Sequence, residues 1–152
     1  MINKINFLFV TLFGIGKIKI IPGTFASLAT TLFLFFLFHI LKISPNIILI
    51  SLIIIFFISL HAVNIFIKDL QSKDPKEVVI DEFIGQSIPL CLYEVAHNVQ
   101  RETDQILKYY FIMFILFRIF DVTKPFPASY YEKNFKNSLV SLWTMSVQAY
   151  ML

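Results

Sequence analysis

An acidic segment between residues 74 and 85 carries the carboxylates with the clearest chemical potential. Asp81 and Glu82 are adjacent and lead directly into an apolar stretch, and Asp74 lies upstream of them. Adjacent carboxylates beside an apolar segment are costly unless they bind something. Hard cations such as Mg²⁺ bind carboxylate oxygens together with phosphate oxygens. The alternative is a solvated acidic helix start, which the helix dipole favours, and the pattern alone leaves both interpretations open.

A second polar cluster combines two cations with one carboxylate. Arg118, Asp121 and Lys124 recur every three residues, so a helix would place them near one another on one face. Arg offers a planar fork to phosphate oxygens, Lys a point charge, and Asp can complete a metal site. The alternative is a pair of cations whose stems lie along an apolar surface, neutralised by one carboxylate.

A third cluster follows Pro22 at the start of a long apolar run. Thr24 is expected to be the N-cap of a helix, and Gly23 would let the backbone come close to a ligand. The free N–H groups of a helix start favour an anion, although for this cluster alone an ordinary helix start is the simpler explanation. Taken together, the three clusters indicate phosphoryl chemistry.

The composition indicates the kind of protein that positions these groups. The chain has 152 residues, of which 57% are hydrophobic and only 15% charged. Soluble domains have about 45–50% apolar and about 25% charged residues, so disorder is excluded and a soluble enzyme is disfavoured. A single cysteine, Cys91, excludes a disulfide framework and a cysteine-based zinc site. The net charge of +3 gives no indication of nucleic-acid binding.

Two long uncharged runs predict a membrane hairpin. Residues 20–41 and 43–67 contain no Asp, Glu, Lys or Arg, and a helix of about 20 apolar residues spans a bilayer. Two shorter helices are predicted at about 84–97 and 107–120, packed on the hairpin. No alternating pattern of strands occurs, so the predicted fold is an all-α membrane bundle, with residues 1–152 as a single domain.

Lysines near the predicted spans indicate the orientation. Most of them precede the first span or follow the second, whereas the loop between the spans has only Lys42. Because basic residues favour the cytoplasmic side, the polar clusters are expected to converge on one cytoplasmic face. A small structural or transport subunit is an alternative function. A transporter would place ionisable groups within its spans, however, and the two runs contain only His39 and His61, each near an end.

The order of these motifs resembles the phosphatidylglycerophosphatase A family over about residues 9–131. The residues that carry the resemblance are Gly14-x-Gly16, Pro22-Gly23-Thr24, Asp74, Val79-x-Asp81-Glu82-x-x-Gly85 and Phe117-Arg118-x-x-Asp121-x-x-Lys124-Pro125-x-Pro127. The resemblance implies a multi-pass, Mg²⁺-dependent phosphatase of the bacterial inner membrane with its site facing the cytoplasm. Such an enzyme converts phosphatidylglycerophosphate into phosphatidylglycerol in phospholipid biosynthesis.

The resemblance also implies roles for individual residues. Asp81, Glu82 and Asp121 would be catalytic and would hold the metal, with Asp74 as a further candidate ligand. The substrate-binding residues would be Gly23, Thr24, Arg118 and Lys124. The implied partners are an anionic phospholipid and the membrane, with no nucleic acid, and the oligomeric state is not indicated.

The C-terminal segment departs from the family. The family has a Gly-rich turn followed by an Asp-Asp pair, whereas residues 137–152 contain no acidic residue. We interpret residues 138–152 as divergent because the reading frame of the gene has shifted. Codons can be written for Ser138 to Ala149 such that one additional thymidine makes the same bases encode Ser-Phe-Gly-Val-Ile-Val-Asp-Asp-Val-Gly-Ala. The chain as given is then expected to have weak or no activity. A catalytically inactive, lipid-binding relative is therefore a further alternative.

Overall fold

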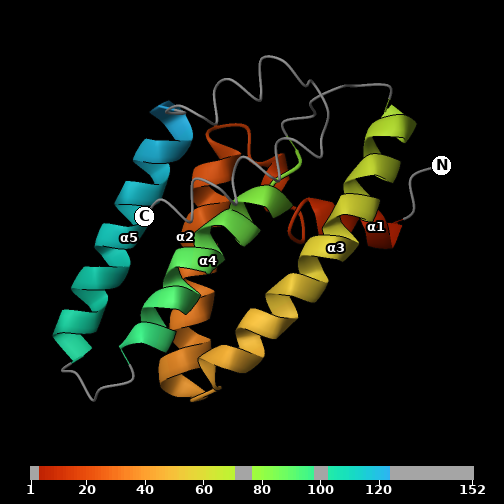
Figure 1. Ribbon diagram of the computed structural model, residues 1–152. Coiled ribbons are helices and arrows are strands. Elements are labelled where there is room, and N and C mark those ends of the chain that lie inside the picture. The colour runs from red at the N-terminus through yellow and green to blue at the C-terminus, as the bar shows by residue number, and fades with distance from the viewer. Residues whose placement is uncertain (1–3, 71–76, 98–102, 124–152) are drawn as a thin grey trace.

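A computed structural model of the chain describes residues 4–70, 77–97 and 103–123, which form a bundle of helices (Figure 1). Every regular element within these ranges is helical, which confirms the all-α prediction. The elements are α1 (Lys4–Val10), η1 (Ile15–Lys17), α2 (Pro22–Phe35), the π-helical turn η2 (Phe36–Ile40), α3 (Pro45–Leu70), α4 (Ile80–Ala96) and α5 (Thr103–Thr123).

The two long predicted helices are present. Helix α2 with η2 corresponds to the run at 20–41, and α3 corresponds to the run at 43–67. Both are long and apolar enough to cross a membrane, with mean hydropathies of 1.7 over Pro22–Ile40 and 2.6 over Pro45–Lys68. Only 28% of the α3 window is buried inside the protein. Large apolar side chains such as Phe57, which is 65% exposed, therefore need a cover outside the bundle.

Helix α4 lies at the centre of the bundle, between α2, α3 and α5 (Figure 1). Helices α2 and α4 run in one direction, and α3 and α5 run in the other. The starts of α2 and α4 and the ends of α3 and α5 therefore lie at the same end of the bundle, which we call the site end. This arrangement confirms, for the described residues, that the three polar clusters converge.

A short N-terminal helix supports the beginning of α4. On α1, Val10 is fully buried in a cluster with Phe66 of α3 and Ile80 of α4. The Val79 N–H donates to the Val10 carbonyl at 3.2 Å, so α1 also holds the residue before α4 through its backbone. Gly16 adds a close approach, because a Cβ there would collide with the Glu77 carbonyl. Helix α1 and the Gly16 turn thus fix where the acidic segment enters α4.

Candidate active site

The two adjacent carboxylates lie in the first turn of α4. The sequence predicts this helix from residue 84, but it begins at Ile80, so Asp81 and Glu82 are helical. The helix dipole favours negative charge at this position. The Asp81 side chain is 9% exposed, and its Oδ1 accepts a hydrogen bond from the Glu82 N–H at 3.1 Å. The carboxylates are therefore held at the edge of the bundle core.

Glu82 has a buried acceptor that the described residues leave without a hydrogen bond. Its Oε2 is inaccessible to solvent and has no hydrogen-bond partner in the described part of the chain. Burial raises the pKa of Glu82 well above its ordinary value, and the nearby negative charges of Asp81 and Asp121 raise it further. A buried acidic group in this state favours a cation or a proton beside it. At this end of the bundle the carboxylates therefore need a proton or a cation to balance their charge.

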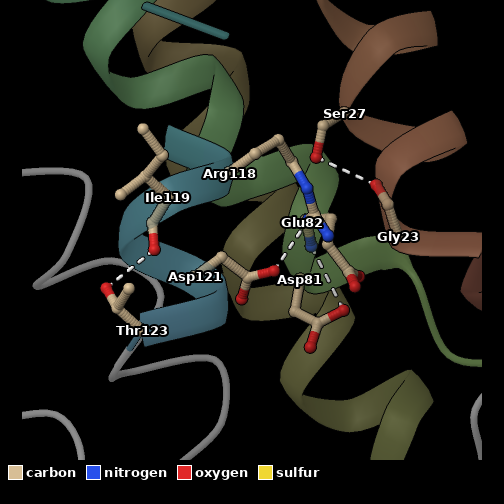
Figure 2. Close-up of polar contacts among 8 residues, drawn as sticks. All are labelled: Gly23, Ser27, Asp81, Glu82, Arg118, Ile119, Asp121 and Thr123. Carbon is tan, nitrogen blue, oxygen red and sulfur yellow. Dashed lines mark hydrogen bonds and ion pairs between the residues drawn. The ribbon is translucent and has the colours of Figure 1, made fainter. Parts of the chain in front are cut away.

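Gly23 of α2 borders the Glu82 side chain. A Cβ added at Gly23 would collide with the Glu82 carboxylate, so the absence of a side chain there gives the carboxylate its space. Gly23 was predicted to let the backbone approach a ligand. In the structure it lets the backbone approach the Glu82 carboxylate, and Figure 2 shows the two residues facing each other.

Arg118 and Asp121 come from the last turns of α5. Arg118 Nη1 lies 2.7 Å from Asp121 Oδ2, one helical turn away, and the two side chains are 14% and 11% exposed. Figure 2 shows both side chains pointing toward Asp81 and Glu82 of α4. The structure therefore brings together five of the predicted site residues from three helices. These residues are Gly23, Asp81, Glu82, Arg118 and Asp121.

The prediction that Thr24 caps α2 is wrong. The helix begins at Pro22, its N-cap is Ile21 with φ of 50°, and no side chain caps it. Proline is well suited to a first helical position, because its φ is already helical and its missing N–H needs no partner there. Thr24 therefore lies inside the first turn, where it is half-buried. Its predicted role in substrate binding stays a prediction.

Two other predicted site residues, Lys124 and Asp74, lie outside the described residues, as does the divergent segment 138–152. The described residues contain no group of three His, Cys, Asp or Glu side chains placed to hold a metal ion by themselves. Mg²⁺ does not require one, because it is commonly bound through one or two carboxylates together with substrate phosphate oxygens. The buried carboxylates and the unpartnered Glu82 Oε2 fit such a shared site.

Gln86 is a polar residue at this site that the sequence analysis did not single out. It lies four residues after Glu82 on α4 and is fully buried. The available signal was its spacing, since residues four apart share a helix face. Gln86 therefore lies one turn from a candidate site carboxylate, on the same side of α4.

Comparisons with known proteins identify the family. The chain matches the family described as Phosphatidylglycerophosphatase A over residues 8–142. The chain belongs to this family. It is 32% identical over 139 residues to the phosphatidylglycerophosphatase A of Haemophilus influenzae, a match that covers 90% of this chain and 77% of the relative.

A second relative has a different name. A Bacteroides thetaiotaomicron protein named "Putative phosphatidylinositol-3-phosphatase" is 31% identical over 129 residues, covering 84% of this chain and 76% of the relative. No solved structure matches the chain. Membership of the phosphatidylglycerophosphatase A family makes the chain a lipid phosphatase, a phosphoric monoester hydrolase. Together with the two membrane-length helices, it indicates a membrane protein.

Proposed function

We propose that this chain removes the terminal phosphate of phosphatidylglycerophosphate in a Mg²⁺-dependent reaction that gives phosphatidylglycerol. The observation that carries the proposal is the meeting of Asp81 and Glu82 of α4 with the Arg118–Asp121 pair of α5. A phosphomonoester needs both kinds of group, carboxylates to hold a cation and a guanidinium to bind phosphate oxygens. The name of the Haemophilus influenzae relative supports the choice of substrate.

The residues of α4 and α5 have different roles in this proposal. Arg118 binds the phosphoryl oxygens and neutralises the charge that develops on them, which is the main contribution to phosphoryl-transfer catalysis. Asp121 orients the Arg118 guanidinium through their 2.7 Å ion pair. One or two of the carboxylates of Asp81, Glu82 and Asp121, together with phosphate oxygens of the substrate, would hold Mg²⁺, which when bound supplies a Lewis acid. One of these carboxylates accepts the proton of the attacking water.

The orientation in the inner membrane is part of the proposal. We place the site end on the cytoplasmic side, because lysines flank it while the α2–α3 turn at the opposite end has only Lys42. A reporter fused at Lys42 is expected to be periplasmic, and reporters fused after Lys73 and Lys124 are expected to be cytoplasmic. A cytoplasmic reporter at Lys42 would contradict this orientation.

The test of function is phosphate release from phosphatidylglycerophosphate by the purified protein in detergent, with Mg²⁺ and with a chelator. We expect turnover that requires Mg²⁺ and that is lost in Asp121→Asn. Phosphatidylinositol 3-phosphate serves as the second substrate, because of the name of the Bacteroides relative. If the inositol lipid were turned over faster than phosphatidylglycerophosphate, the inositol lipid would be the better assignment of the substrate. Binding of lipid without any phosphate release would favour the inactive, lipid-binding relative.

A further inference from the structure

The amide of Gln86 is buried in the bundle without hydrogen bonds. The residue is fully buried, and neither Nε2 nor Oε1 has a hydrogen-bond partner among the described residues. A buried polar group left without a partner is destabilising, and few such groups occur in a native structure. The presence of an unpaired amide in the core beside α4 therefore requires an explanation.

The hydroxyl groups on the facing helix are already engaged. Helix α2 packs against α4, and its buried polar residues are Ser27, Thr30 and Thr31. Each of these hydroxyls donates to the carbonyl four residues earlier on α2, at 2.8–2.9 Å. Their protons are consequently not directed at the Gln86 carbonyl oxygen. Among the described residues the donor and the acceptor of this amide both lack a partner, which a molecule from outside the chain would supply.

The position of Gln86 indicates which molecule that is. Four residues of α-helix advance by about 6 Å and return to nearly the same side, so Gln86 lies one turn deeper than Glu82. Glu82 Oε2 is likewise buried and unpartnered. Two consecutive turns of α4 thus carry unused polar atoms, the first beside Arg118 and Asp121 and the second farther into the bundle. A ligand that places its phosphate at the first turn would reach the second with the carbons next to the phosphate.

We propose that Gln86 binds a hydroxyl group on the carbon next to the phosphate-bearing carbon of the substrate, an inference that rests on the proposed function. The amide carbonyl accepts from this hydroxyl, and the amide N–H donates to the adjacent ester oxygen. The headgroup of phosphatidylglycerophosphate has such a hydroxyl, and so does an inositol 3-phosphate. In phosphatidate the neighbouring carbon is acylated, so the amide would stay unpaired. Gln86 then selects against phosphatidate, the simplest phosphomonoester lipid.

The first test is binding, which does not require the chain to turn over substrate. The probes are two short-chain phosphonate analogues of phosphatidylglycerophosphate, one with and one without the central hydroxyl of the headgroup, titrated calorimetrically in detergent with Mg²⁺. We expect the wild-type chain to bind the hydroxylated probe about tenfold more tightly, since the other probe leaves a buried amide unpaired. Gln86→Met, which keeps the length but not the amide, should reduce this preference to about twofold or less.

Ser59→Ala is the matched control, because Ser59 is also fully buried and its hydroxyl bonds only within α3, to the Phe56 carbonyl. This variant should keep the wild-type preference. Equal binding of both probes by the wild-type chain would overturn the inference, and so would an unchanged preference in Gln86→Met. Phosphate release separates the two proposals. A chain that prefers the hydroxylated probe but releases no phosphate supports the role of Gln86 and contradicts the proposed activity.

Thermal unfolding without ligand separates binding from a structural role. If the amide serves a ligand, Gln86→Met removes an unpaired polar group and should raise the unfolding midpoint in detergent by a few degrees. A lower midpoint would mean that the amide stabilises the unliganded protein, which would overturn the inference. Turnover of phosphatidylglycerophosphate, phosphatidylinositol 3-phosphate and phosphatidate then identifies the headgroup. Phosphatidate hydrolysed as fast as the other two would also overturn it.

Discussion

Two glutamates near opposite ends of α4 have different surroundings. At the site end, Glu82 Oε2 has no hydrogen-bond partner among the described residues. Toward the other end, Glu94 Oε1 accepts a hydrogen bond from the Tyr110 hydroxyl of α5 at 2.8 Å. The same oxygen lies 3.3 Å from His39 Nε2, which comes from η2 at the end of α2. Glu94 therefore connects three helices, whereas Glu82 has an oxygen left over.

The rings around Glu94 strengthen this contrast. Phe35 packs against His39 with ring centroids 4.8 Å apart, and against Tyr110 at 5.6 Å. Polar contacts between helices within a membrane stabilise their association, and here they lie among close-packed rings. The Glu94 cluster thus has the character of a structural connection, and the site end has the character of a binding site. A titratable residue in a membrane bundle is better judged by its partners than by its type.

Neutralising the site carboxylates is the strongest test of the contrast between the site end and the Glu94 cluster. In any active form of this enzyme, Asp81→Asn and Asp121→Asn should each lower turnover by about a thousandfold, because the site loses an oxygen ligand for Mg²⁺ or the base for the attacking water, while the protein still inserts into the membrane. Phosphate release and membrane fractionation measure the two effects. Glu77→Gln is the control, since Glu77 is exposed and should change turnover by less than about twofold. Equal losses in all three variants would contradict our division of the acidic segment.

The next largest effect concerns the divergent C-terminal segment. A chain with the alternative frame after Ser138, which contains an Asp-Asp pair, should turn over substrate about a hundredfold faster than the chain as given. The added carboxylates would supply further oxygen ligands to a hard cation. The measurement is phosphate release by both forms, together with resequencing of the gene. If resequencing confirms the reading frame and the chain as given has full activity, the frame slip and our assignment of the metal ligands are both wrong.

Arg118 tests the cationic part of the site. Arg118→Gln should reduce kcat/KM by about a hundredfold, because the phosphoryl oxygens lose their guanidinium. Arg118→Lys should reduce it by about tenfold, since a point charge replaces the planar fork. If Lys proved as poor as Gln, the charge of Arg118 would not be what binds phosphate.

Gly23 tests the space beside Glu82. Gly23→Ala puts a methyl group where the Glu82 carboxylate lies, so this carboxylate or α2 must move. We expect a loss of about tenfold in kcat/KM from the displaced carboxylate, measured by phosphate release at several Mg²⁺ concentrations. Unchanged kinetics would show that Glu82 has room to move and that its position is not critical.

The smallest effect on activity is expected at the Glu94 cluster. Tyr110→Phe removes the 2.8 Å hydrogen bond and should lower the free energy of unfolding by about 1 kcal/mol. The value of kcat/KM should change by less than about threefold, since the cluster lies toward the end of α4 opposite Asp81 and Glu82. Chemical unfolding in detergent and phosphate release provide the two numbers. A loss of activity comparable to that of Arg118→Gln would remove the distinction between the two ends of α4.

The long helices could be predicted from the sequence because their uncharged runs have a single simple explanation. The shorter elements were harder. Helix α1 has only 7 residues, and its stability comes from contacts such as those of Val10 with distant parts of the chain. The start of α4 was predicted too late, because the charge of Asp81 separates this residue from the apolar segment in a hydropathy pattern. In the structure, the hydrogen bond from the Val79 N–H to the Val10 carbonyl holds the residue before the helix, which begins earlier.

The site was partly predictable for a similar reason. Spacing along one helix placed Arg118 beside Asp121, and the adjacency of two carboxylates before an apolar stretch singled out Asp81 and Glu82. What no local pattern contained was the contact between Gly23 and Glu82, which depends on the packing of α2 against α4. The unpaired state of the Gln86 amide likewise follows only from the packed bundle.

The two membrane-length helices differ in length, and this difference makes the thickness of the surrounding lipid relevant to the site. The α2 window has 19 residues and the α3 window 24, which correspond to about 28 Å and about 36 Å of helix. A hydrocarbon layer of about 30 Å matches the first, so α3 must tilt to hide its excess length. Phe66 of α3 packs in one cluster with Ile80, the first residue of α4. A change in acyl-chain length that alters the tilt of α3 would therefore act on the turn that holds Asp81 and Glu82.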